Sequence, residues 1–169
     1  MMVKRRTGKD FSPSRFAAGI HIFSDGAAIP NPGAGGWGVV VYEDGYALHS
    51  ESGFAVVSTN NRMEMQGAIA ALMWMRANGD PEAQLHTDSQ YASKGANEWR
   101  HGWKNKRLMR GGIPIPNADL WQEMSAILDD FPISLNWVRG HSGIAGNEAA
   151  DRMAVAAMKR GIKNSRSAA

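Results

Sequence analysis

The chain has 169 residues, a formal net charge of +3 and a hydrophobic fraction of 43%, values that fit one domain built around a single core. It contains no cysteine, which excludes disulfides, thiolate metal sites and a cysteine nucleophile. Its apolar runs are shorter than the roughly 18 residues of a membrane span, so we expect a soluble cytoplasmic protein, by default a monomer, with no membrane partner.

Three strands are predicted in the first third of the chain. Apolar and β-branched residues mark residues 19–23, 35–42 and 46–57, and short turns rich in Gly, Pro and Asp connect them. Connections this short predict an antiparallel trio. Residues 1–17, which precede these strands, hold five basic residues and one acid, and we expect them to form a flexible basic tail.

The rest of the chain alternates between helical and extended patterns. We predict a fold of the α/β class, a mixed five-stranded sheet in which two parallel strands follow the three antiparallel ones, flanked by helices. The expected domain spans residues 18–160 and is followed by a C-terminal tail over 161–169. The predicted elements are a helix over 61–78, a strand over 83–88, one or two short helices over 89–109, a helix over 117–130, a strand over 133–138 and a helix over 146–160.

Basic residues are concentrated in three segments: residues 1–17, residues 99–110 and the C-terminal end. Together these segments hold 14 of the 19 basic residues and 1 of the 16 acids, which leaves 5 basic and 15 acidic residues, a balance of −10, in the remainder. Each segment alone is typical of a solvated tail or helix face. Together they indicate a polyanionic partner.

Two aspartates end predicted strands. Asp25 follows the first strand, where Gly26 breaks the pattern, and Asp88 follows the fourth. Taken singly, the first is typical of a turn and the second of a helix cap. Because the carboxyl ends of strands in a mixed sheet form the usual ligand crevice, the two carboxylates are expected to meet there and to repel each other unless a cation intervenes.

Two further carboxylates face apolar helix stripes. Glu64 shares its face with Ala68 and Met75, and Asp151 shares its face with Ala154. A carboxylate that faces a core needs a partner or a metal. Four carboxylates suit hard divalent cations such as Mg²⁺, and two such ions about 4 Å apart can activate water in phosphodiester hydrolysis.

Four sequence motifs, taken in their order along the chain, are more specific than any of these residues alone. FSDGAAIPNPGAGGWG, TNNRMEMQGAIAAL, LHTDSQY and WVRGHSGIAGNEAADRMA together resemble type 1 ribonuclease H, particularly the bacterial form, over about residues 18–160. The resemblance implies a ribonuclease H-like fold and an endonuclease that hydrolyses the RNA strand of RNA/DNA hybrids. It also implies two-metal-ion catalysis with two Mg²⁺ ions, or Mn²⁺ as a substitute, giving 5′-phosphate and 3′-hydroxyl ends.

Carried over motif by motif, the resemblance assigns metal binding to the four carboxylates Asp25, Glu64, Asp88 and Asp151. His141 matches a mobile-loop histidine that assists proton transfer or product release. Without the resemblance, His141 reads as a solvated loop imidazole. An imidazole is a side chain suited to proton transfer.

The resemblance also implies contacts to the hybrid. Gly26, Asn60, Glu64 and Gln90 match contacts to the RNA strand, and Asn31 and Thr59 match a phosphate pocket for the DNA strand. Segment 99–110 resembles a basic protrusion that grips DNA, and the alternative interpretation is an amphipathic helix whose tryptophans pack inward. The residues implied there are Trp99, Trp103, Lys104, Lys106, Arg107 and Arg110.

Two rival hypotheses remain at this point. One is a nuclease of the same superfamily that acts on DNA, such as a resolvase or an integrase core, against which the complete D, E, D, D order and the GHSG motif argue. The other is a catalytically silent module that binds hybrids through the basic segments. Metal titration distinguishes the silent module from an enzyme, because a silent binder neither cleaves nor requires the ions.

Overall fold

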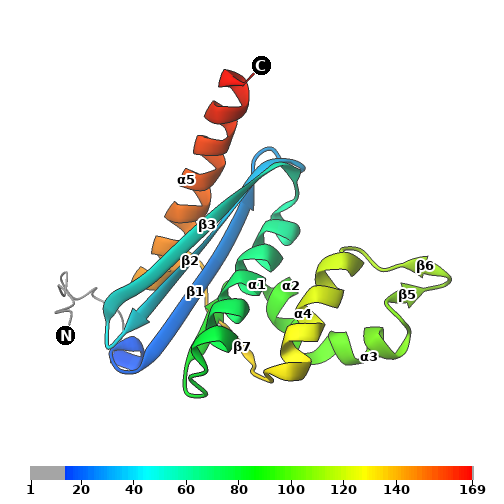
Figure 1. Cartoon of the computed structure of the whole chain (residues 1–169), viewed down its shortest axis with the longest axis horizontal. Helices are drawn as coiled ribbons and strands as arrows, with labels where there is room; N and C mark the ends of the chain where they lie inside the picture. Colours follow the sequence, from blue (N-terminus) through cyan, green and yellow to red (C-terminus); the bar gives the residue numbers. More distant parts are fainter. Residues whose placement is uncertain (1–13, 169) are drawn as a thin grey trace.

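The computed structural model describes residues 14–168 of the chain. Most of the predicted basic tail, up to residue 13, therefore lies outside the described residues. Within them, helices cover both faces of one twisted sheet, and a helical arm with a small hairpin extends from one side (Figure 1).

The central sheet has five strands in the spatial order β3-β2-β1-β4-β7. The first three pair antiparallel, while β4 pairs parallel to β1 and β7 parallel to β4. This confirms the predicted mixed sheet. The strands are β1 (Ile20–Ala28), β2 (Gly33–Glu43), β3 (Tyr46–Ser58), β4 (Gln84–Thr87) and β7 (Leu135–Trp137).

Two apolar cores lie on opposite faces of the sheet. The larger one packs α1 (Asn60–Asn78) and α4 (Ala118–Asp130) against residues such as Val39 and Leu85. The smaller one packs α5 (Ala145–Ser167) against residues such as Phe23 and Val40. Alternation along the strands, with Ile22 in the first core and Phe23 in the second, explains how each strand serves both cores.

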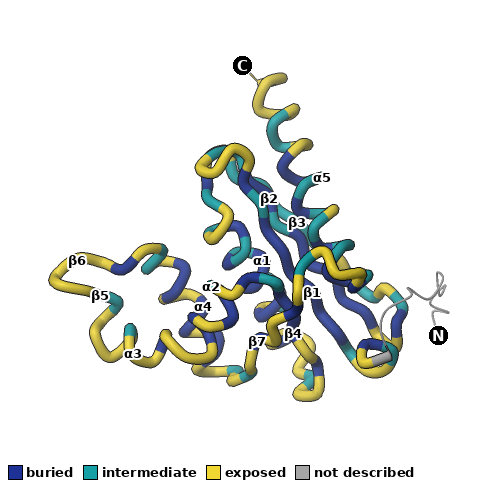
Figure 2. Tube along the Cα trace, turned by 180° about the vertical axis from the view of Figure 1, so that it is seen from behind, coloured by how far each residue is buried: buried dark blue, intermediate teal, exposed yellow. Residues whose placement is uncertain are grey.

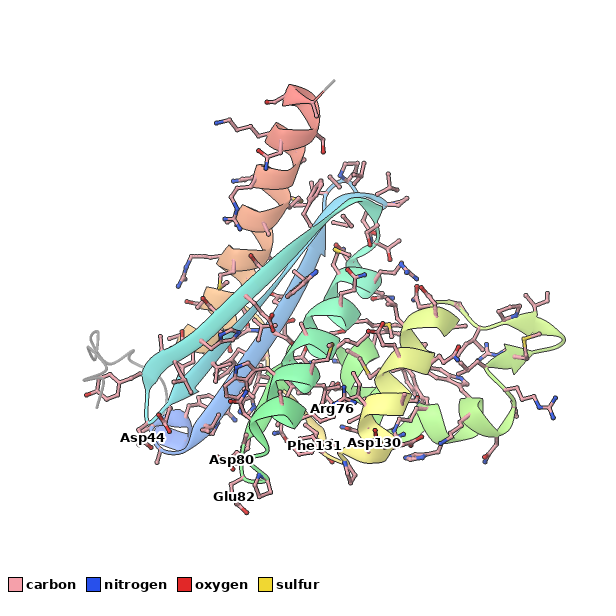
Figure 3. The ribbon with its side chains drawn as sticks, viewed as in Figure 1. Asp44, Arg76, Asp80, Glu82, Asp130 and Phe131 are labelled. Atoms are coloured by element: carbon pink, nitrogen blue, oxygen red, sulfur yellow. The ribbon has the colours of Figure 1, made fainter. Side chains whose placement is uncertain are left out.

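Local chemistry fixes the ends of α1 where they were expected. The Thr59 hydroxyl accepts a hydrogen bond from the Arg62 amide at 3.3 Å and caps the N-terminus. Gly79 ends the helix at φ 66°, donating its amide to the Met75 carbonyl. Ion pairs then join α1 to α4: Arg62 contacts Asp119 at 2.7 Å, and Arg76 lies 3.9 Å from Asp130 (Figure 3).

The arm is a run of three helical segments followed by a hairpin. The segments are α2 (Gln90–Lys94), the π-helical η2 (Gly95–Trp99) and α3 (Arg100–Asn105), and the hairpin pairs β5 (Met109–Arg110) with β6 (Ile113–Pro114). The sequence predicted the helices but not the hairpin. Its turn uses Gly111 and Gly112 at positive φ, which suits a tight two-residue turn.

Both ends of the packed structure extend past the expected limits. Before residue 18, η1 (Ser14–Phe16) places Phe16, 4% exposed, against the rings of Phe23 and His86 at 5.3 and 5.0 Å. At the other end, α5 continues seven residues past the predicted end at 160, to Ser167, and projects beyond the sheet (Figure 1). Gly161, which signals an end in the sequence, instead lets α5 pass the ring of Phe54.

None of the helices formed by residues 14–168 is both long enough and apolar enough to cross a bilayer.

We predict that Gly36→Ala destabilises the fold and that Gly102→Ala does not. A methyl group on Gly36 would lie 2.2 Å from the carbonyl oxygen of Ala154 and force α5 off the sheet, whereas nothing lies within 4 Å of one on Gly102. We expect a loss of about 2–3 kcal/mol for the first variant and a gain of about 0.5–1 kcal/mol for the second, which replaces a helical glycine. Urea unfolding followed by circular dichroism measures both, and equal midpoints would refute the close packing of α5.

Candidate active site

Strand register brings Asp25 and Asp88 together. The parallel pairing of β1 with β4 ends at Ser24 and Thr87, so the next residue on each side is an aspartate. The expectation that Asp25 ends its strand was wrong, because β1 continues to Ala28 through its pairing with β2. Asp25 instead lies where its other neighbour, β4, has ended.

A glycine brings the third carboxylate close. A Cβ atom on Gly26 would lie 2.2 Å from the carbonyl carbon of Met63 and 2.3 Å from the amide nitrogen of Glu64, so the backbones of β1 and α1 touch here. Only a residue without a side chain permits this approach. It places Glu64, in the first turns of α1, beside Asp25.

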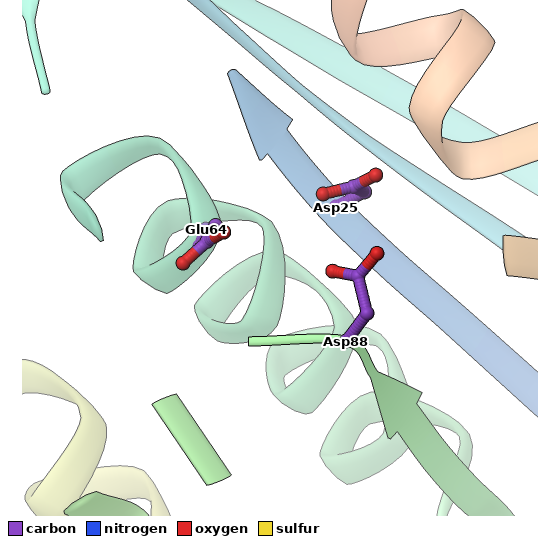
Figure 4. Close-up of side chains that lie close together, drawn as sticks. All are labelled: Asp25, Glu64 and Asp88. Carbon is purple, nitrogen blue, oxygen red and sulfur yellow. The ribbon is translucent and has the colours of Figure 1, made fainter. Parts of the chain in front are cut away.

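The three carboxylates form one cluster. Each of Asp25, Glu64 and Asp88 offers an oxygen atom, and these atoms lie within 4.8 Å of one another. Figure 4 shows the side chains of Asp25 and Asp88 directed into the same space, with Glu64 facing them from α1. Because oxygen donors at this separation suit a hard divalent cation, the three residues fit a magnesium or manganese ion.

Burial and like charge shape the electrostatics of the cluster. Burial, and then the charges of Asp88, Asp151 and Glu64, raise the pKa of Asp25 to about 8, against the opposing effect of the Gly26 amide, which donates to Asp25 at 2.7 Å. Burial also raises the pKa of Glu64 and that of Asp88. A bound cation would remove this cost by pairing with the charged forms.

Asp151 and His141 lie at the edge of the cluster. Asp151, on α5, is not among the three residues whose oxygen atoms converge, but its charge raises the pKa of both Asp25 and Asp88. His141, an exposed loop residue at φ 51°, lowers the pKa of Asp88. Both predicted residues therefore act electrostatically on the cluster.

Three residues that support the cluster were missed in the sequence as parts of the site. The Ser89 hydroxyl accepts from the Ala92 amide at 3.1 Å, which caps α2, and its hydrogen bond to Glu64 lowers the pKa of that carboxyl. Asn147, 2% exposed, lies beside Asp88 and lowers its pKa. A side chain on the third, Gly140, would meet Asp88 Oδ2 at 2.5 Å.

Two of these three residues, Ser89 and Gly140, had a signal in the sequence, because each is adjacent to a predicted site residue. Ser89 directly follows Asp88, and Gly140 directly precedes His141. The glycine suggests a flexible loop in the sequence, but the structure gives it a different reason, because its missing side chain makes room for a carboxylate.

The residues predicted to form a phosphate pocket lie together at the N-terminus of α1. Asn31 Oδ1 accepts from the Asn60 amide at 3.1 Å, and Asn60 Oδ1 accepts from the Ala28 amide at 2.7 Å. With the cap residue Thr59, these side chains fix the β1–β2 turn to the helix start, where backbone amides favour an anion. Gln90, which is exposed, begins α2 one residue after Ser89.

The arm divides the predicted DNA-contact residues into two groups. Trp99, Trp103, Lys106 and Arg110 line one hollow of about 790 Å³. Lys104 instead contacts Asp129, which Arg100 also contacts at 2.9 Å. Arg107, exposed at φ 51°, does not line the hollow.

The two tryptophans of the arm have different surroundings. The ring of Trp103 lies 5.0 Å from that of Trp121, so it packs inward as the alternative interpretation expected. Trp99 is 39% exposed and lies 5.6 Å from Trp103. An inner and an outer tryptophan therefore line the same hollow.

Comparison with known proteins gives consistent matches. The family model for RNase H matches residues 17–159. A protein named ribonuclease H from Cyanothece sp. is 52% identical over 137 residues, which cover 79% of this chain and 85% of that protein. The crystal structure of LC9-RNase H1, a type 1 RNase H with the type 2 active-site motif, superposes with a TM-score of 0.68 at 30% identity and covers 85% of this chain and 73% of its own.

A second solved structure agrees in fold. LC11-RNase H1, solved in complex with an RNA/DNA hybrid, superposes with a TM-score of 0.63 at 23% identity and covers 85% of this chain and 99% of its own.

We predict that Asp25→Asn stabilises the metal-free protein at high pH. Since the folded pKa of about 8 exceeds the ordinary value of 3.8, the folded protein binds the extra proton, and its stability falls as pH rises from about 4 to 8. An amide in its place has no proton to lose. With EDTA present, we expect the variant to melt higher than the parent by on the order of 5 °C near pH 8.5 and by about 1 °C near pH 4.5.

Scanning calorimetry at both pH values measures this difference. Asp119→Asn serves as the control, because Arg62 lowers the pKa of that carboxyl and the same reasoning gives a loss of stability at high pH. A melting difference for Asp25→Asn that does not change with pH would contradict the prediction.

Proposed function

The chain belongs to the ribonuclease H family of enzymes, and we propose that it is an endonuclease that hydrolyses the RNA strand of RNA/DNA hybrids by two-metal-ion catalysis. The proposed products carry 5′-phosphate and 3′-hydroxyl ends. One observation carries the proposal: Asp25, Glu64 and Asp88 come from three separate elements and converge within 4.8 Å.

The proposed cofactor is Mg²⁺, two ions per active site, with Mn²⁺ as a substitute. Asp25, Glu64 and Asp88 would hold the ions together with Asp151. When bound, such ions activate water and stabilise charge on the phosphate and the leaving oxygen. The raised pKa of Asp25 favours the protonated carboxyl at neutral pH in the metal-free protein, so the binding of an ion would release that proton.

The surrounding residues orient the carboxylates and move protons. Ser89 fixes Glu64 by hydrogen bonding, while Asn147 and His141 favour the charged form of Asp88. His141 is exposed on a loop that contacts Asp88 through Gly140. An imidazole in this place is suited to donating a proton to the leaving oxygen or to assisting product release.

Recognition of the two strands is proposed to use different groups. Gly26, Asn60, Glu64 and Gln90 would contact the RNA strand, where the 2′-hydroxyl distinguishes RNA from DNA. Asn31 and Thr59 would hold a DNA phosphate at the start of α1. The arm would contact DNA through Trp99, Trp103, Lys104, Lys106, Arg107 and Arg110, chiefly the four that share the hollow.

We further propose that the protein acts as a cytoplasmic monomer with residues 18–160 as its catalytic domain. All four carboxylates come from one chain, which supports a site that needs no second subunit. The absence of cysteine agrees with a reducing compartment.

We predict that the protein with Mg²⁺ cuts only the RNA strand of an end-labelled RNA/DNA hybrid. Asp25→Asn and Asp88→Asn should each lower the rate at least about 100-fold, because each removes a metal ligand, and EDTA should abolish cleavage. Matched double-stranded RNA, double-stranded DNA and single-stranded RNA are the substrate controls. Cutting of DNA would favour the resolvase-like rival, and binding without cleavage, also with Mn²⁺, would favour the silent module.

We predict that Lys106→Ala combined with Arg110→Ala weakens hybrid binding in a salt-dependent way. Loss of two phosphate contacts should lower the slope of log Kd against log salt by about 2. Arg76→Ala, which removes a cation that pairs with Asp130 away from the arm, should leave the slope unchanged. Fluorescence anisotropy in EDTA over a range of KCl concentrations measures both, and an equal slope for all proteins would remove the arm from the proposed interface.

A further inference from the structure

The second half of α5 carries an unopposed positive charge. From Arg152 to the end of the chain there are five basic residues and no acid, and Asp151 is the last acidic residue. All five are exposed, and Figure 2 shows the distal turns of α5 as largely exposed. We call these residues the α5 basic face: Arg152, Lys159, Arg160, Lys163 and Arg166.

Helical geometry aligns these cations. At about 100° per residue, four of them lie within an arc of about 60°, and Arg160 lies about 80° from Arg152. The buried residues Ala150, Ala154 and Ala157, which pack on the sheet, lie on the opposite side of the helix. The face extends about 21 Å along α5, comparable to six phosphates of one duplex strand at roughly 3.4 Å each.

A hollow lies beneath the start of this face. It has a volume of about 360 Å³ and lies where α5 crosses the edge strand β3. Arg152 and Arg160 line it together with Ser52, and small residues such as Ala156, one turn from each arginine, leave the space open. Arg160 Nη2 donates to Ser52 Oγ at 3.2 Å, so the hydroxyl and one guanidinium are already positioned together.

Neighbouring acids do not neutralise the hollow. Among residues 14–168, no carboxylate pairs with Arg152 or Arg160. Glu148, one turn before Arg152, accepts from the Gly143 amide at 3.2 Å and is directed toward the histidine loop. Glu51 lines a different hollow, with Trp37 and Trp74. Two guanidiniums and a hydroxyl around an open space are a donor set for a phosphate group.

This site is separate from the catalytic cluster. Asp151 and Arg160 are nine residues apart, which places them about 180° apart around α5. Asp151 acts on the cluster, whereas Arg160 reaches β3. We propose that Arg152, Ser52 and Arg160 form a second phosphate-binding site, which the α5 basic face extends, and that it holds the backbone of a nucleic-acid segment outside the catalytic groove.

The surface of α5 favours nucleic acid over an anionic membrane. Helices that lie on membranes insert large apolar side chains beside their basic residues. Among the described residues, the large exposed hydrophobic side chains all lie outside α5, and apart from the basic residues its distal exposed positions are Asn164, Ser165 and Ser167. The choice of nucleic acid as the polyanion rests on the proposed function.

The test compares two substrates and three proteins. One substrate is a short hybrid, and the other is the same hybrid with a single-stranded DNA extension of about 20 nucleotides, longer than the basic face. The proteins are the full-length parent, a charge reversal with Arg160→Glu and Lys163→Glu, and a charge-retaining control with Arg160→Lys and Lys163→Arg. Anisotropy in EDTA gives Kd for each pair, and circular dichroism melting shows that each variant is folded.

We expect the extension to tighten binding about 10-fold for the parent and the charge-retaining control at low salt, and less than twofold for the reversed variant. Cleavage of the short hybrid with Mg²⁺ should be the same in all three proteins, and that measurement tests the proposed function independently. An equal gain from the extension in the reversed variant would overturn the inference. So would binding of phosphatidylserine vesicles by the parent, lost on charge reversal, without any gain from the extension, because it would assign the face to lipid.

Discussion

The burial and mutual repulsion of three closely spaced carboxylates are the constraint on which the rest of the structure depends. The fold holds Asp25, Glu64 and Asp88 within 4.8 Å of one another, at a cost that is visible in the pKa of Asp25, which burial, and then the neighbouring charges, raise to about 8. No local preference of the chain would bring these groups together. They remain close because strand pairing, helix packing and the apolar cores elsewhere in the molecule stabilise the backbone that carries them.

Glycines allow close contacts between elements, and these contacts hold that backbone in place. Gly26 lets α1 contact β1, Gly36 and Gly38 let α5 lie directly on β2, and Gly140 lets the histidine loop reach Asp88. These positions require glycine because it has no side chain, and not because φ is positive there. The site is thus held from both faces of the sheet, because a shift of α1 would move Glu64 away from Asp25, and a shift of α5 would move Asp151 at the edge of the cluster.

Much of this organisation could be predicted from the sequence. Periodicity identified the strands and the long helices, and the positions of Asp25 and Asp88 near expected strand ends predicted that these two carboxylates meet. Two kinds of feature could not be read this way. The hairpin after Asn105 is short and exposed, so it has no apolar period, and α5 passes Gly161 because of a contact with Phe54 that is distant in sequence.

Among the site residues, too, some contacts could be predicted from the local sequence and others depend on residues far apart in the chain. Asp25 and Asp88 meet because β1 and β4 share a register, which sequence can suggest once a parallel pair is expected. The pairing of Lys104 with Asp129 joins the arm to α4 across 25 positions, and no pattern within segment 99–110 indicates it. Charge counted along the chain therefore overstates the positive charge that the arm presents to a ligand.

The first turns of α1 join two groups that were described separately. Thr59, the N-cap of α1 and part of the predicted phosphate pocket, and Glu64, in the carboxylate cluster, are five residues apart, a rise of about 7.5 Å, and the contact of Gly26 with Met63 fixes this helix against β1. In the proposed function, a duplex must therefore place a DNA phosphate and an RNA phosphate at one set separation across a groove. Groove width thus becomes a criterion of substrate selection, applied by a rigid spacing in the protein without any contact to a base.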